Sequence, residues 1–337
     1  MSFKETLLNK RRIQMTKRPL IIDCDPGIDD AQCIMMIKGS GKFDIRGITP
    51  VHGNVPLSST KANALFLNSY YGINAPVAVG AGEAMIARLE RAEMAHGKTG
   101  LGSFEYSLDG LEYSDKKAWD LIWEEAQKCG GELELLAIGP LTNIAILILK
   151  HPEVVGLIKR FVIMGGGATR GNHTQLGEFN IWQDPHAAEI VFKAGFKDFY
   201  MVDLDACGTA YFSREDQDII LEHAEKTSLR ELFEKFAEFR EEMWKIREIP
   251  FELKKYFLEH YSPPDAAAAA VIIDPSICSY VDKYVTVDCN GVLTAGQTVV
   301  DWFGFTGSPN MHVVRSIDRE RYVKLFLDCL DSYREVQ

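Results

Sequence analysis

The sequence predicts an α/β fold: a single open, mostly parallel twisted sheet flanked by helices. Two observations favour it. Short apolar runs alternate along the chain with segments of helical periodicity, and such alternation requires crossover connections, which make neighbouring strands parallel. The chain has 337 residues, of which 46% are hydrophobic and 25% charged, as in ordinary globular proteins. We therefore expect one domain over residues 19–337, preceded by a polar tail over residues 1–18.

Each expected element follows from its local pattern. Residues 115–128, for example, place Ala118, Leu121, Ile122 and Ala126 at helical spacing. The expected strands are residues 19–22, 45–49, 75–79, 132–138, 160–164, 199–204 and 312–314. The expected helices are residues 31–38, 58–70, 115–128, 143–149, 185–194, 266–273 and 319–330.

Two segments depart from the alternation. Residues 214–261 are charged, helical in pattern and rich in aromatic residues, so we expect a helical lid over the open end of the sheet. Residues 284–300 read as a C-terminal β-hairpin around Asn290-Gly291, because this dipeptide favours tight hairpin turns.

Charge and cysteine usage exclude several classes of protein. The 48 acidic and 37 basic residues give a net charge of −11, which disfavours binding to nucleic acid or to an anionic membrane. The seven cysteines are scattered and form no CxxC pair, which suits a reducing compartment and predicts a cytoplasmic protein. The N-terminal residues lack the apolar core of a signal peptide, and no apolar run is long enough to span a bilayer.

An acidic cluster follows the first expected strand. Four carboxylates lie within eight residues: Asp23, Asp25, Asp29 and Asp30. Ligands bind in this position in open α/β sheets. Capping of the next helix explains one or two of these carboxylates. Four on one turn must share protons or surround a cation, and Ca²⁺ or Mg²⁺ suits an all-oxygen site.

The cluster belongs to a series of motifs. The first is DCDPGIDDA at residues 23–31. Others follow: HGN at 52–54, HG at 96–97, IGPLTN at 138–143, MGGG at 164–167, GN at 171–172, EFN at 178–180 and DP at 184–185. In this order the motifs resemble the nucleoside hydrolase family of the inosine- and uridine-preferring type, from about residue 19 to the C-terminus. The resemblance implies hydrolysis of the N-glycosidic bond of ribonucleosides, small molecules that yield free base and ribose, and a homodimer or homotetramer.

The resemblance also implies a role for each residue of the acidic cluster. The implied metal ligands are Asp25, Asp30, Asp265 and the backbone carbonyl of Ile138. Ca²⁺ suits this set because it accepts six to eight oxygens in loose geometry. A bound cation lowers the pKa of the attacking water, and Asp29 would take its proton. Asp23 would contact the ribose or orient the site.

Polar residues further along the chain match the ribose-binding positions of the family. They are Asn54, Asn172, Glu178 and Asn180. Amide and carboxylate groups can pair with several hydroxyls at once. An unpaired buried donor or acceptor costs about 1–3 kcal/mol, so such a site should reject deoxyribose.

The leaving group is where the chain departs from the family. Many members place a histidine directly before the late aspartate, where it protonates the departing base, but here that residue is Pro264. His96 is the candidate replacement acid. Alternatively, stacking on Trp244 or Tyr261 of the expected lid would ease protonation of a purine at N7. This second route favours purine ribonucleosides.

Two other functions fit parts of the pattern. A haloacid-dehalogenase-like phosphatase also begins with a strand ending in Asp-x-Asp, as in Asp23-Cys24-Asp25, although Gly27 stands where that family has Thr or Val. The second alternative is a ribose- or calcium-binding relative that lost its chemistry with the histidine at position 264.

Overall fold

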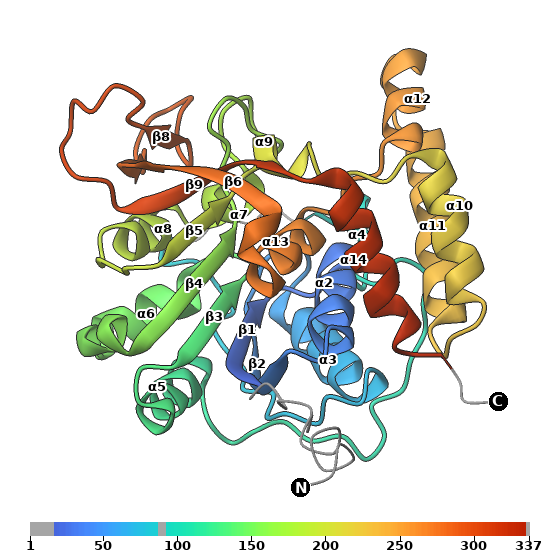
Figure 1. Cartoon of the computed structure of the whole chain (residues 1–337), viewed down its shortest axis with the longest axis horizontal. Helices are drawn as coiled ribbons and strands as arrows, with labels where there is room; N and C mark the ends of the chain where they lie inside the picture. The colour runs from blue at the N-terminus through green and yellow to red at the C-terminus, as the bar shows by residue number, and fades with distance from the viewer. Residues whose placement is uncertain (1–16, 87–91, 335–337) are drawn as a thin grey trace, which may run out of the picture.

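The computed structural model describes residues 17–86 and 92–334 and contains the predicted sheet (Figure 1). Its strand order is β2-β1-β3-β4-β5-β9-β6. The strands are β1 (Arg18–Cys24), β2 (Phe43–Pro50), β3 (Leu133–Ala137), β4 (Ile158–Met164), β5 (Phe199–Val202), β6 (Cys278–Lys283) and β9 (Met311–Ile317). All neighbouring pairs are parallel except β6 and β9. The predicted fold class is confirmed.

Helices cover both faces of the sheet because the side chains of its central strands alternate between two cores. In β1, Leu20 and Ile22 pack into one core and Ile21 into the other. The first core is formed with α2 (Ile28–Gly39), α3 (Leu57–Tyr70), α13 (Pro264–Ile273) and α14 (Arg319–Asp331). The second is formed with α5 (Ala118–Cys129), α6 (Thr142–Lys150) and α8 (Pro185–Phe192), on the opposite side in Figure 1.

One strand prediction is wrong, and one strand of the sheet was missed. Residues 75–79 form only an isolated bridge, between Val77 and Ile48, because Pro76 has no N–H for a ladder. The edge strand β6 was not predicted, because its sequence, CSYVDK, is mostly exposed and carries little apolar signal. It pairs with β9 in the antiparallel sense, as edge strands of such sheets often do.

The lid segment is helical, as expected. It contains α10 (Arg214–Ala224), α11 (Arg230–Ile246) and α12 (Phe251–Glu259). Ser213 begins it with a capping box, in which its side chain accepts from the N–H of Asp216. The helix α12 has no buried residue and projects from the body beside the end of α11 (Figure 1).

The C-terminal hairpin is present with a different connection. β7 (Val285–Val287) pairs with β8 (Thr298–Val300) in antiparallel register. Asn290 and Gly291 lie within the longer loop between them, where Asp288 Oδ1 accepts both of their N–H groups. They therefore do not form a two-residue turn.

The first strand begins within the segment predicted as a tail. Arg18 opens β1, and its guanidinium binds the carboxylate of Glu134 on β3 at 3.0 Å. Residues 1–16 of that segment lie outside the described residues. Within the described ranges, no helix combines the length and apolar character that crossing a membrane requires.

Candidate active site

The site lies where strands β1 and β3 end and two helices begin. Asp25 follows β1, Ile138 follows β3, and Asp29 and Asp30 lie in the first turn of α2. Asp265 lies in the first turn of α13. Both helices thus direct the positive ends of their dipoles toward the same carboxylates.

Three carboxylates converge at this point. Single oxygens of Asp29, Asp30 and Asp265 all lie within 4.8 Å of one another. Asp30 and Asp265 are buried, and Asp29 is partly exposed. The Asp30 carboxylate also accepts from the N–H groups of Gly27, at 2.8 Å, and Asp25, at 3.2 Å. The capping explanation therefore holds for Asp30 and leaves the other two carboxylates unexplained.

Asp25 follows β1 and is not among the three converging carboxylates, although its N–H donates to one of them, Asp30. Its Oδ2 accepts the N–H of Asn54 at 2.7 Å, and its buried Oδ1 has no hydrogen-bond partner among the described residues. A Cβ at Gly53 would lie 1.9 Å from Oδ2, and one at Gly139 would lie 2.6 Å from Oδ1. A side chain at either glycine would therefore clash with this carboxylate.

Burial and mutual repulsion disfavour the charged forms of these groups. Burial, reinforced by the charge of Asp29, raises the pKa of Asp30 to about 8. The pKa values of Asp25 and Asp265 are raised well above the ordinary range, first by burial and then by the neighbouring carboxylates. A divalent cation would offset this repulsion, and the orphaned Oδ1 of Asp25 offers it a ligand. The residues present fit such an ion.

The carbonyl of Ile138 is held in place from the opposite side. The side-chain amide of Asn180 donates to it at 3.1 Å and to the carbonyl of Met164 at 3.2 Å. The N–H of Ile138 in turn donates to the carbonyl of Asp23 at 2.9 Å. The strands β1, β3 and β4 thus contribute to one rigid edge.

Asp23 has a separate environment from the converging carboxylates. Its Oδ2 accepts from Thr49 Oγ1 at 2.6 Å and from Asn143 Nδ2 at 2.8 Å. Burial raises its pKa to about 7, although both hydrogen bonds oppose the shift. Asp23 therefore ties β1 to β2 and to α6. Thr49 and Asn143 were missed as partners, although Asn143 lies in a motif already singled out.

The predicted ribose-binding residues occupy different positions. Asn54 and Asn180 are buried against Asp25 and Ile138. Glu178 caps α7 (Phe179–Gln183) by accepting from the N–H groups of Asn180 and Ile181, and burial raises its pKa to about 7. Asn172 is exposed, and its side-chain oxygen accepts the N–H of Phe179. The structure does not bring the Asn172 side chain to the carboxylates.

His96 lies against the start of α2. Its Nδ1 accepts the N–H of Ile28 at 3.2 Å and is 3.6 Å from Asp29 Oδ1. Accepting this bond assigns the ring proton to Nε2. Burial lowers the pKa of His96, in spite of the opposing effect of Asp29. The imidazole is therefore neutral near pH 7.

Tyr261 and Trp244, the two aromatic residues predicted to stack on the base, have different surroundings. The hydroxyl of Tyr261 donates to Gln32 on α2 at 3.0 Å, and the guanidinium of Arg240 lies 4.2 Å from the centre of its ring. Trp244 stacks on Phe257 within the lid, with ring centres 4.5 Å apart. The guanidinium of Arg247 also lies 4.8 Å from the centre of a Trp244 ring, and the predicted stacking of Trp244 on the base stays a prediction.

Comparison with known proteins agrees with this geometry. The profile of a family described as inosine-uridine preferring nucleoside hydrolase matches residues 20–324. The chain is 32% identical over 320 residues to the pyrimidine-specific ribonucleoside hydrolase RihA of Escherichia coli O9:H4 (strain HS), covering 94% of this chain and 99% of the relative. A Shigella flexneri protein of the same name is equally similar.

Solved structures show the same fold. A plant nucleoside hydrolase, PpNRh1, superposes with a TM-score of 0.83 at 27% identity, covering 93% of this chain and 99% of the other. The purine-preferring ribonucleoside hydrolase of Gardnerella vaginalis gives a TM-score of 0.84 at 27% identity, covering 93% and 98%. From the extent of the family match, the ordered motifs and the converging carboxylates, the chain belongs to the nucleoside hydrolase family, whose members cleave N-glycosyl bonds.

Proposed function

We propose that the protein hydrolyses the N-glycosidic bond of ribonucleosides with the help of a bound Ca²⁺ and releases free base and ribose. One observation carries this proposal: oxygens of Asp29, Asp30 and Asp265, from two helices distant in sequence, lie within 4.8 Å of one another. Asp25, Asp30, Asp265 and the Ile138 carbonyl would hold the ion. When bound, it would lower the pKa of the attacking water and accept ribose hydroxyls as ligands.

Asp29 is the proposed general base. Unlike Asp30, which accepts two backbone N–H groups, Asp29 has a buried Oδ1 without a hydrogen-bond partner among the described residues. It is also less buried than Asp30 and Asp265, so water can reach it. The surrounding carboxylates stabilise the positive charge that develops on the ribosyl ring as the bond to the base breaks.

The ribose is proposed to lie between the two sides of the site. Asn54 borders the cluster at Asp25, while Glu178 and Asn180 border it at Ile138. Asp23 acts by orienting this edge of the sheet, through its bonds to Thr49 and Asn143. Asn172 would join the site only by exchanging its bond to Phe179 for a ribose hydroxyl.

For the base we propose a preference for purines. Pro264 cannot donate a proton, and His96 is held neutral by burial, so a base that accepts a proton at N7 is favoured. The names of the relatives divide on this point: those from Escherichia coli are called pyrimidine-specific and that from Gardnerella vaginalis purine-preferring.

Release of reducing sugar from the common ribonucleosides, with added Ca²⁺ and with a chelator, tests the proposal. We expect free ribose with Ca²⁺, none after chelation, and no turnover of p-nitrophenyl phosphate. Ribose binding without ribose release would identify the catalytically silent relative. Turnover of p-nitrophenyl phosphate without release of ribose from the ribonucleosides would contradict the proposed reaction.

A further inference from the structure

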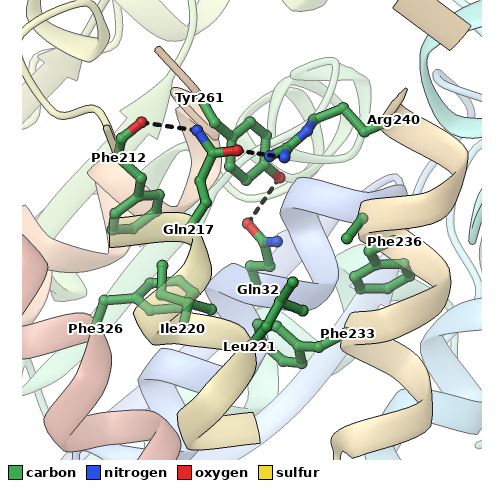
Figure 2. A pocket seen from close by; sticks show the side chains of 11 residues that line it. Gln32, Phe212, Gln217, Ile220, Leu221, Phe233, Phe236, Arg240, Tyr261 and Phe326 are labelled. Carbon is green, nitrogen blue, oxygen red and sulfur yellow. Dashed lines mark hydrogen bonds between the residues drawn. The ribbon is translucent and has the colours of Figure 1, made fainter. Parts of the chain in front are cut away.

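Four polar side chains form a connected group beside the site. They line a cavity of about 40 Å³ between α2, α10, α11 and α14, whose other walls are apolar (Figure 2). The four residues are Gln32, Gln217, Arg240 and Tyr261. The cavity has room for only a few water molecules. These side chains bind one another around the cavity.

The contacts run from the lid to α2. Arg240, on α11, donates to Gln217 Oε1 and lies over the ring of Tyr261, 4.2 Å from its centre. Gln217 Nε2 donates to the carbonyls of Phe212 and Leu258, each at 3.1 Å. The hydroxyl of Tyr261 donates to Gln32 Oε1 at 3.0 Å, as Figure 2 shows.

Arg240 is an unusual residue for this location. Its guanidinium is largely buried, burial lowers its pKa, and its Nε has no hydrogen-bond partner in the part of the chain that the structure describes. Within residues 17–86 and 92–334, no carboxylate forms an ion pair with it. Burying an unpaired cation is costly, and the face of an aromatic ring recovers part of that cost. The guanidinium over the ring and the hydrogen bond to Gln32 both constrain the orientation of Tyr261.

Tyr261 and Gln32 join the two helices that carry the converging carboxylates. Gln32 lies two residues after Asp30 on α2, and Tyr261 lies four residues before Asp265, just ahead of α13. The backbone of Tyr261 is also fixed, because it exchanges two hydrogen bonds with Phe212, at 2.7 and 3.0 Å. The bond between Tyr261 and Gln32 thus holds the two N-termini together near carboxylates that repel one another.

We propose that Tyr261, oriented by Arg240, is a positioning residue that sets the spacing of Asp30 and Asp265, so that the lid segment and the cation site are energetically coupled. This inference rests on the proposed cation site. By linkage, Ca²⁺ binding should stabilise the lid segment as much as an ordered lid segment favours Ca²⁺ binding.

Calcium titration by calorimetry tests the positioning role. Tyr261→Phe removes one hydroxyl and keeps the ring. We expect it to weaken Ca²⁺ binding by about three- to tenfold, the usual size of one lost hydrogen bond. Tyr333→Phe is the matched control, because Tyr333 lies outside residues 214–261 and its hydroxyl donates to the carbonyl of Met35, in the second half of α2, at 3.1 Å. We expect the control to keep the wild-type affinity.

Arg240→Met tests whether Arg240, on α11 of the lid segment, acts through Tyr261. It also replaces Tyr261→Phe as the test if that variant does not fold. It should weaken Ca²⁺ binding as well, and its effect should not add to that of Tyr261→Phe, because both act through one ring. Amide hydrogen exchange should show Ca²⁺ protecting α11 and α12 in the wild type and protecting them less in Arg240→Met.

The outcomes separate the inference from the proposed function. Wild-type protein that binds Ca²⁺, together with variants of unchanged affinity and unchanged exchange, would overturn the coupling and leave the cation site in place. Wild-type protein that does not bind Ca²⁺ would overturn both. Weakened Ca²⁺ binding in Tyr261→Phe, with Tyr333→Phe unaffected, supports the inference.

Discussion

The backbone N–H of Ile28 donates to Nδ1 of His96, with 3.2 Å between the two nitrogens. The same ring nitrogen is 3.6 Å from Asp29 Oδ1. The histidine therefore caps the first turn of α2 as a neutral ring, and its remaining proton, on Nε2, can form a hydrogen bond but is not readily transferred. The role of an acid for the departing base, expected of His96 from the sequence, loses support.

This geometry makes a prediction for His96. Because burial lowers its pKa, an imidazolium would form only well below neutrality. We expect kcat to show no loss as the pH rises from about 6.5 to about 8, where an ordinary histidine acid would deprotonate. A pH–rate profile measures this. A falling limb in that range that disappears in His96→Ala would restore the histidine as the acid.

We expect Asp29 to be essential for turnover and dispensable for Ca²⁺ binding. Asp29→Asn keeps the shape of the side chain and removes the proton acceptor, so kcat should fall by about 10²–10⁴. Calcium affinity should persist, because the proposed ligands remain. Steady-state rates measure the fall in kcat, and a calcium titration measures the retained Ca²⁺ affinity. Asp109→Asn, on an exposed loop, is the matched control and should keep the wild-type rate. Substantial turnover in Asp29→Asn would exclude Asp29 as the base.

The raised pKa of Asp30 predicts how stability depends on pH without the ion. Its folded-state pKa of about 8 exceeds the ordinary value of 3.8, so the folded state holds a proton that the unfolded state releases between these values. The free energy of unfolding therefore falls as pH rises through that window. Asp25 and Asp265 act in the same direction.

We expect the Tm of chelated protein to be lower at about pH 8 than at about pH 6, and Ca²⁺ to raise it more at the higher pH. Asp30→Asn should flatten both dependences. Scanning calorimetry in the two buffers measures them. Chelated protein whose Tm rises across the same interval would show that the carboxylates are not strained by their proximity.

Base preference can be decided by direct comparison. With no histidine at position 264, we expect kcat/KM for inosine or adenosine to exceed that for uridine or cytidine. The reason is that a purine can take up a proton at N7, whereas Pro264 cannot donate one to a pyrimidine. Parallel assays at matched Ca²⁺ check it. Uridine ahead of inosine would reverse the assignment and align the protein with its pyrimidine-specific relatives.

Much of the fold could be predicted because periodicity reports burial. The runs that became β1, β3 and β4 are buried in the centre of the sheet and have a strong apolar signal. The edge strand β6 is mostly exposed and has little. The stretch around Val77 is apolar, but its neighbour Pro76 limits pairing to a single bridge. Local apolarity does not reveal whether a backbone N–H can join a ladder.

The site was predictable to the extent that its residues lie in ordered motifs. Asp29, Asp30 and Asp265 converge, whereas Asp25, the fourth carboxylate of the predicted site, is not among the three, and the predicted role of each stays a prediction. Contacts between remote side chains could not be predicted. Nothing in the spacing of Gln32, Arg240 and Tyr261 indicates that they meet, because their proximity depends on how the lid helices pack. The stacking of Trp244 on Phe257 could likewise not be predicted from their spacing.

The central claim is that carboxylates from both ends of the domain bind one divalent ion. Calorimetric titration of Ca²⁺ into the wild-type protein and into Asp265→Asn tests this claim most directly. We expect a single site in the wild type and its loss, or a large drop in affinity, in the variant. Wild-type protein that takes up no Ca²⁺, or Asp265→Asn that binds it as tightly, would contradict the proposed centre.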